Sequence, residues 1–192
     1  VEAKASTKVS DTQNVEIEGD LDHYVGRAAH KLLAACEAFP GVATRVAGAH
    51  AIDVGASTGG FTQVLLERGA AHVVALDVGH GQLAEPVKSD PRVTDLEGVN
   101  VRDVVSATQL DGSPFALVVS DLSFISLTLA LPHMSFLLAD DGDLIALIKP
   151  QFEVGKDRLG SGGVVRSAEL RAEVTAEVAL YAQSLGLSLR GV

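Results

Sequence analysis

The Gly-rich stretch at residues 49–63 constrains the fold more than any other part of the chain. It reads Ala-His-Ala-Ile-Asp-Val-Gly-Ala-Ser-Thr-Gly-Gly-Phe-Thr-Gln, so an apolar run ends at Asp53 and apolar residues at helical spacing follow the glycines. This pattern is typical of a buried strand that turns tightly into a helix. Gly55 and Gly59 can adopt positive φ and let a ligand approach the main chain closely. The stretch alone leaves open whether this turn binds a ligand or only joins a strand to a helix.

The glycine spacing separates the possible ligands. A dinucleotide-binding loop reads Gly-x-Gly-x-x-Gly, but Ser57 stands where the middle glycine would be. The chain has no Gly-x-x-x-x-Gly-Lys-Ser/Thr phosphate loop, which argues against ATP hydrolysis. Asp77 ends the next apolar run, where nucleotide-binding βαβ units place an acceptor for ribose hydroxyls. These features favour a cationic nucleoside ligand such as S-adenosylmethionine.

Length and composition predict one α/β domain in a reducing compartment. The 192 residues are enough for a sizeable core, and the single cysteine, Cys36, excludes an internal disulfide. No apolar stretch reaches the ~18 residues of a membrane span, and residues 1–20 are too polar for a secretory signal. We therefore predict a cytoplasmic protein without stable membrane association. Because the chain begins at Val1 rather than methionine, we expect it to be a piece of a longer protein.

The net charge of −10 argues against nonspecific binding of nucleic acid, which depends on lysine and arginine neutralising phosphates. Local basic sites are still present. Arg27, His30 and Lys31 fall at helical spacing and form a cationic patch, which either contacts a ligand or is a solvated helix face.

Apolar runs and helical periodicity alternate along the chain. Residues 1–21 lack apolar periodicity and are predicted to be a linker, whereas residues 22–192 form one domain. Besides the helix that ends near Gly69, helices are predicted at 22–39, 126–139 and 168–185. Strands are predicted up to Asp53 and at 72–77, 93–96, 115–120, 143–148 and 187–192. This alternation predicts a doubly wound, mostly parallel sheet.

Charged residues follow several predicted strands. Asp121 follows the strand at 115–120, and Lys149 follows the strand at 143–148. Ligands of open parallel sheets lie beyond the carboxyl ends of the strands, so we expect these two side chains near the ligand. Asp103 could accept a hydrogen bond from an adenine amino group, or it could cap the next helix.

The segment at residues 151–166 is rich in glycine and carries Lys156 and Arg158. We interpret it as too flexible for a core element. It is either a mobile substrate loop or an ordinary surface loop.

Six segments, in order, resemble the TlyA family of FtsJ-like ribosomal RNA 2′-O-methyltransferases, some of whose members carry the name haemolysin. The resemblance covers about residues 22–192. The segments are Tyr24–Leu32, Asp53–Thr62, Asp77–Leu83, Asn100–Asp103, Ser120–Ile125 and Leu147–Glu153. One departure is Gly-Arg-Ala-Ala at residues 26–29, where the family usually has Ser-Arg-Gly-Ala.

The resemblance implies a Rossmann-like S-adenosylmethionine-dependent methyltransferase that acts on ribosomal RNA within ribosomal subunits. It also implies an S4-type RNA-binding domain ahead of residues 1–21. The family's catalytic set is Lys-Asp-Lys-Glu, and its first three members fall on Lys31, Asp121 and Lys149. The glutamate would lie beyond Val192, and Glu153 is not proposed in its place.

The resemblance also implies roles for individual residues, and no metal site. Lys149 would take the proton of the ribose hydroxyl, Asp121 would orient Lys149, and Lys31 would hold the target ribose. The predicted cofactor-binding residues are Asp53, Gly55, Ser57, Gly59, Gly60, Phe61, Asp77 and Asp103, and the predicted substrate-binding residues are Arg27, Lys156 and Arg158.

Three other functions stay open at this point. They are a nicotinamide-dependent oxidoreductase, a membrane-active haemolysin and a catalytically silent RNA-binding fragment. The glycine spacing speaks against the first, and the second needs an amphipathic or spanning segment that the sequence does not show.

Overall fold

The computed structural model of the chain describes residues 8, 10, 13, 23–104, 109–160 and 162–192. The predicted linker at residues 1–21 therefore lies almost entirely outside the described residues. Of the described helices, none is both long enough and apolar enough to cross a membrane.

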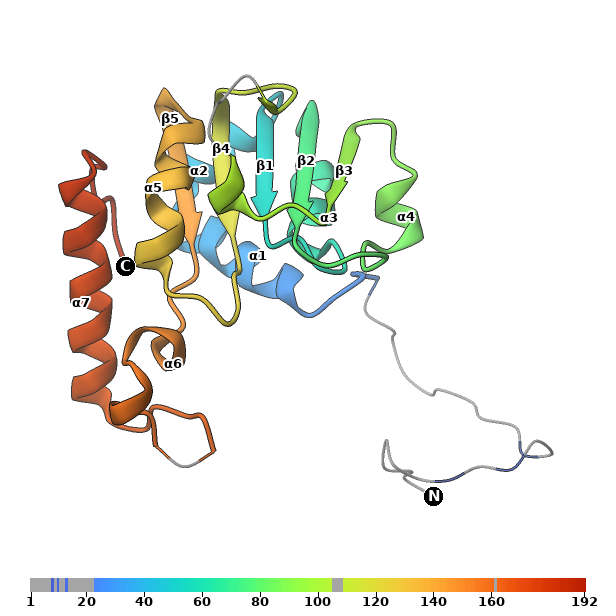
Figure 1. Ribbon diagram of the computed structural model, residues 1–192. Helices are drawn as coiled ribbons and strands as arrows, with labels where there is room; N and C mark the ends of the chain where they lie inside the picture. Colours follow the sequence, from blue (N-terminus) through green and yellow to red (C-terminus); the bar gives the residue numbers. More distant parts are fainter. Residues whose placement is uncertain (1–7, 9, 11–12, 14–22, 105–108, 161) are drawn as a thin grey trace.

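Five parallel strands form the sheet of the described domain, in the order β3-β2-β1-β4-β5 (Figure 1). They are β1 His50–Val54, β2 His72–Asp77, β3 Val93–Glu97, β4 Phe115–Ser120 and β5 Leu138–Ala146. The strand order reverses between β1 and β4, where Val54 pairs with Ser120. The predicted doubly wound parallel sheet is confirmed, and this reversal is where such sheets bind ligands.

Helices cover both faces of the sheet because alternate residues of each strand face opposite ways. Ala51 of β1 packs with α1, α2 and α3, while its neighbour Ile52 packs with α5 and α7. These helices are α1 Ala28–Ala38, α2 Pro40–Val46, α3 Gly60–Glu67, α5 Leu127–Leu137 and α7 Ala168–Ser184. The short elements are α4 Glu85–Lys88, η1 Val101–Asp103, α6 Pro150–Glu153 and η3 Lys156–Arg158. Both faces of the central strands are buried, which explains their nearly continuous apolar sequences.

The first helix differs from its predicted range of 22–39. α1 begins at Ala28, after a turn at residues 23–27, and residue 22 is outside the described part. It ends before Pro40, as predicted, but Pro40 also begins α2. Proline suits the first position of a helix, where no backbone N–H is needed.

The last two predicted strands are corrected by the structure. β5 begins at Leu138, well before residue 143, and its register on β4 shifts between Phe115 and Leu117. The early part of β5 contains Asp140, Asp141 and Gly142, which carry no apolar signal of a strand. The strand predicted at 187–192 is wrong, since those residues have no regular structure. The amino-acid composition of a segment shows whether it would suit a half-buried strand, but it does not show whether a neighbouring strand is there to pair with it.

The Gly-rich segment at 151–166 also differs from its prediction, because part of it is a small core. Val154 and Val165 are buried against Val174 of α7. Its first residues belong to α6, and the rest of the segment, residue 161 excepted, lies near the first turn of α7 (Figure 1).

Candidate active site

A cavity of ≈ 280 Å³ lies beyond the carboxyl ends of β1, β4 and β5. Its lining brings together eight of the predicted site residues, from α1, the Gly-rich loop and the ends of β4 and β5. These eight are Arg27, Lys31, Asp53, Gly55, Ser57, Phe61, Asp121 and Lys149. The sequence prediction that charged strand ends converge on one site is thus met by the geometry.

The loop after β1 needs glycine at several of its positions. Gly55 has φ 88° and Gly59 has φ 94°, the left-handed region that favours glycine. A Cβ at Gly59 would lie 2.8 Å from Leu83 Cδ1. Gly60 is crowded in another way, since its Cβ would lie 3.0 Å from the backbone nitrogen of Ala29 in α1. The glycines therefore hold a tight turn against α1 and α4.

Asp77 ties this turn to the loop after β2. Its Oδ2 accepts a hydrogen bond from the Ser57 N–H at 2.8 Å, and its Oδ1 accepts one from the Gly79 N–H at 2.7 Å. Ser57 itself has φ 49°, a strained conformation for a residue with a side chain. Each carboxylate oxygen can accept a second hydrogen bond, so Asp77 keeps capacity for ribose hydroxyls.

Asp53 is a buried carboxyl with one oxygen unpaired. It is 1% exposed, and its Oδ2 accepts hydrogen bonds from the Thr62 N–H at 3.0 Å and the Thr62 hydroxyl at 2.8 Å. Its Oδ1 is buried without a hydrogen-bond partner among the described residues. Burial raises the pKa of Asp53 to about 7, with help from the charges of Asp121 and Asp77 and against the hydrogen bonds from Thr62.

Asp121 lies between two lysines. Its Oδ2 is 2.8 Å from Lys31 Nζ, and its Oδ1 is 2.8 Å from Lys149 Nζ. The Lys149 side chain is 17% exposed, and that of Lys31 is 49% exposed. Partial burial by itself raises the pKa of Asp121, but the hydrogen bonds and charges of Lys149 and Lys31 outweigh burial and hold it below its usual value.

Two neighbours of this Lys-Asp-Lys cluster were missed from the sequence. Lys149 Nζ also donates to the Ser123 hydroxyl at 2.7 Å and to the Asp121 carbonyl at 3.3 Å. Phe124, the next residue, is 92% exposed with φ 65°, and its ring lies 5.3 Å from that of Phe152. A strained backbone that presents an apolar ring to solvent is a feature of functional sites. The sequence signals were their position just after the charged end of a strand and their place in the family-like segment Ser120–Ile125.

Asp103 does not line this cavity. It is the exposed last residue of η1, whose cap is Asn100, because the Asn100 side chain accepts from the Arg102 N–H at 3.0 Å. The interpretation of Asp103 as a cap is not supported for η1, and residues 105–108 are outside the described part. Its contact with adenine stays a prediction.

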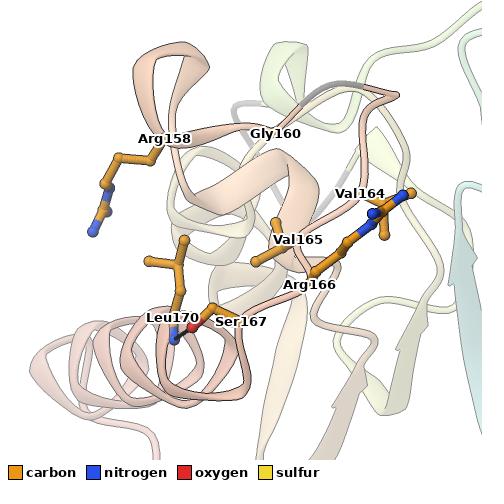
Figure 2. A pocket seen from close by; sticks show the side chains of 7 residues that line it. All are labelled: Arg158, Gly160, Val164, Val165, Arg166, Ser167 and Leu170. Atoms are coloured by element: carbon orange, nitrogen blue, oxygen red, sulfur yellow. Dashed lines mark hydrogen bonds between the residues drawn. The ribbon is translucent and has the colours of Figure 1, made fainter.

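Lys156 and Arg158 lie outside this cavity, near α7. Arg158 donates to the Val154 carbonyl at 3.0 Å and pairs with Glu173 of α7 at 2.6 Å. Arg158 helps to line a second, smaller hollow of ≈ 210 Å³ at the N-terminus of α7 (Figure 2). Figure 2 shows the side chains of Arg158 and Arg166 on opposite sides of this hollow, so they do not converge on one point. The role of Lys156 and Arg158 in substrate binding stays a prediction.

The contacts of Glu153 indicate a structural role. Its carboxylate accepts from the Ser126 hydroxyl at 2.6 Å and from the Leu127 N–H at 2.9 Å. It therefore satisfies the first turn of α5, where backbone donors lack partners within the helix.

We expect Glu153→Gln to keep turnover at this site within about twofold, because the amide can still bond to both groups. Glu153→Ala should lower the free energy of unfolding by about 1 kcal/mol, the usual effect of losing a helix cap. A turnover assay measures the first effect, and denaturant titration measures the free energy of unfolding. A large loss of turnover in Glu153→Gln at unchanged stability would show that the carboxylate takes part in the chemistry.

Comparison with known proteins identifies the family. The model of the FtsJ-like methyltransferase family matches residues 24–192. A Mycobacterium tuberculosis protein named 16S/23S rRNA (cytidine-2′-O)-methyltransferase TlyA is 50% identical, over 98% of this chain and 69% of its own. Hemolysin A of Brachyspira hyodysenteriae is 40% identical, over 87% of this chain and 68% of its own. The chain thus spans about two thirds of the length of these relatives.

The solved structures agree with this sequence evidence. A Streptococcus thermophilus structure, provisionally described as a hemolysin, superposes with a TM-score of 0.84 at 38% identity. The superposition covers 91% of this chain and 62% of the other. The family-model match over residues 24–192 and the 50% identity to a curated relative show that the chain belongs to the FtsJ-like methyltransferase family.

Proposed function

We propose that the chain carries the active site of an enzyme that uses S-adenosylmethionine to methylate a ribose 2′-hydroxyl in ribosomal RNA. The observation that carries this proposal is the Asp121 carboxylate held between the Lys31 and Lys149 ammonium groups beside a Gly-rich cavity. The substrate is supported by the Mycobacterium tuberculosis relative, whose name specifies cytidine 2′-O-methylation of 16S and 23S rRNA. Since the chain spans 69% of that relative, the activity of the whole protein is part of the proposal.

The cavity fits a nucleoside ligand. The Asp77 carboxylate is held against the Ser57 N–H of the Gly-rich turn and keeps acceptor capacity for hydroxyl groups. The left-handed Gly55 and Gly59 let the ligand approach the main chain, and Asp77 would accept from its ribose. Gly60 and Phe61 would complete the wall at the start of α3. S-adenosylmethionine, when bound, supplies an electrophilic methyl group on a sulfonium sulfur.

Lys31 and Lys149 would act on the ribose hydroxyl of the RNA. A ribose hydroxyl is a poor nucleophile until its proton is removed, and Lys149 Nζ would accept that proton. Lys149 can accept the proton only as the neutral amine. Lys31 is half exposed and would hold the target ribose, while Asp121 fixes the direction of Lys149.

The surface beside the cluster suits an unpaired nucleotide. The exposed Phe124 ring offers a flat face of the kind on which RNA bases stack. Arg27 lines the cavity beside Lys31 and would meet the RNA backbone, as would Lys156 and Arg158 from the Gly-rich segment. We also propose that residues 1–21 join this domain to an S4-type RNA-binding domain and that the protein works in the cytoplasm on ribosomal subunits.

Calorimetric titration of S-adenosylmethionine tests the cofactor assignment. We expect Asp77→Ala to weaken binding at least about tenfold, since it removes a ribose acceptor and two main-chain hydrogen bonds. The matched control is Glu37→Ala, which removes an exposed carboxylate from α1 and should leave affinity unchanged.

A methylation assay on ribosomal subunits, with the chain and its flanking segments restored, tests the reaction. With S-adenosylmethionine labelled at its methyl group, the label should appear in the RNA as 2′-O-methylribose. Tight binding of a nicotinamide dinucleotide in place of S-adenosylmethionine, or leakage of lipid vesicles without methyl incorporation, would contradict the proposed function.

A further inference from the structure

Ser123 lies beside the cavity, in hydrogen-bond contact with Lys149. Both residues line the cavity, and the Lys149 Nζ is 2.7 Å from the Ser123 hydroxyl oxygen. Ser123 follows β4, between Asp121 and Phe124, whose left-handed φ of 65° turns the backbone sharply. The same segment packs on the Gly-rich loop, since a Cβ at Gly55 would lie 3.6 Å from the Asp121 carbonyl oxygen. The position of Ser123 is therefore set by the contacts that build the site.

Three oxygens surround the Lys149 ammonium group. The Asp121 Oδ1 is 2.8 Å from Nζ, the Asp121 carbonyl oxygen 3.3 Å and the Ser123 hydroxyl oxygen 2.7 Å. Only the hydroxyl also carries a hydrogen, because a carboxylate and a carbonyl are acceptors only. A neutral amine has two hydrogens and a lone pair, and the negative charge of an acceptor oxygen repels a lone pair. The two hydrogens of neutral Lys149 therefore belong to Asp121, and its lone pair faces the Ser123 hydroxyl.

This arrangement decides how a ribose hydroxyl can reach Lys149. A tetrahedral nitrogen has four directions, and at Nζ one belongs to its own Cε while the three oxygens take up the others. The Lys149 side chain is also only 17% exposed, whereas Ser123 is exposed. A hydroxyl that arrives from the cavity thus meets Ser123 before it meets Lys149.

We propose that Ser123 relays the proton of the ribose hydroxyl to Lys149. This inference rests on the proposed function and deepens it. The ribose O–H bond breaks as a new O–H bond forms on Ser123, and the former O–H bond of Ser123 breaks as the third N–H bond of Lys149 forms. Ser123 ends as a neutral hydroxyl and Lys149 as an ammonium group paired with Asp121. The ribose oxygen keeps the electron pair with which it attacks the methyl group.

Single-turnover methylation of ribosomal subunits, with the flanking segments of the chain restored, tests the relay. We expect Ser123→Ala to lower the rate about 10²-fold, the lower end of what general acid–base catalysis contributes. Ser123→Thr keeps the hydroxyl and should keep most of the rate. Calorimetric affinity for S-adenosylmethionine should be unchanged in both variants, because the relay acts on the ribose. Ser184→Ala is the matched control, since this serine also donates a hydrogen bond, to the Tyr181 carbonyl at 2.7 Å, but lies at the end of α7.

The rate in mixtures of H₂O and D₂O separates a relay from mere structural support. A relay moves two protons in one step, so the rate should follow a bowed curve against deuterium content in the wild-type chain and in Ser123→Thr. The residual reaction of Ser123→Ala moves one proton, and its plot should be linear. A linear plot for the wild-type chain, or an undiminished rate in Ser123→Ala, would overturn the relay and leave Lys149 as a direct base. Absence of methylation by the wild-type chain, with its flanking segments restored, would overturn the proposed function itself.

Discussion

Lys149→Ala is expected to lower the rate of methyl transfer about 10²- to 10⁴-fold, the range that general-base catalysis contributes. Lys149 Nζ is held by three oxygens, the carboxylate and carbonyl of Asp121 and the hydroxyl of Ser123, so its position is fixed before RNA arrives. Its removal deletes the proton acceptor and leaves the Gly-rich loop and Asp77 in place. Affinity for S-adenosylmethionine, measured by calorimetry, should therefore change little, and the loss should appear in single-turnover methylation.

Lys149→Arg is the matched control for this prediction. Arginine keeps the positive charge and can still pair with Asp121, but it does not give up its proton in proteins. If Lys149 is the base, both variants should be almost inactive. Full activity in Lys149→Arg would assign Lys149 a purely electrostatic role, and weakened cofactor binding with normal turnover in Lys149→Ala would refute the base assignment.

Asp121→Ala should reduce turnover about as strongly, by roughly 10²- to 10³-fold, the usual effect of removing one electrostatic contact from an active site. The substitution leaves two ammonium groups without their shared carboxylate, so Lys31 and Lys149 repel each other and lose their directions. It should also lower the free energy of unfolding, because the Lys149 side chain is only 17% exposed and loses its carboxylate partner, whereas the charge of the half-exposed Lys31 is screened by solvent.

Non-additivity distinguishes a shared role from two separate ones. Because Asp121 acts by holding Lys149, the Asp121→Ala/Lys149→Ala double variant should be about as slow as either single variant. Asp143→Asn is the control, since Asp143 is also a partly buried carboxylate paired with a cation, Arg45, but lies in β5 away from the cavity. Losses that simply multiply in the double variant would show that the two residues act independently.

The sequence alone determined the class of fold and most of the residues that meet at the site. Alternating apolar strands and periodic helices specify a parallel sheet, and the carboxyl ends of parallel strands share one edge. Asp53, Asp121 and Lys149 lie at or just beyond the carboxyl ends of three strands, so their convergence could be predicted from the sequence. The Gly-rich loop was predictable for a similar reason, because positive φ is a local property of glycine.

The tertiary structure alone decided which groups touch. Lys31 reaches Asp121 across 90 positions of the sequence, and Glu153 caps a helix that begins 26 positions earlier. The unpaired oxygen of Asp53 is likewise visible only once Thr62 has occupied the other one. The misjudged ends of β5 and the wrong strand at 187–192 have the same origin. Local sequence records the preferences of a segment, whereas hydrogen-bond partners and strand pairing depend on which distant segments pack beside it.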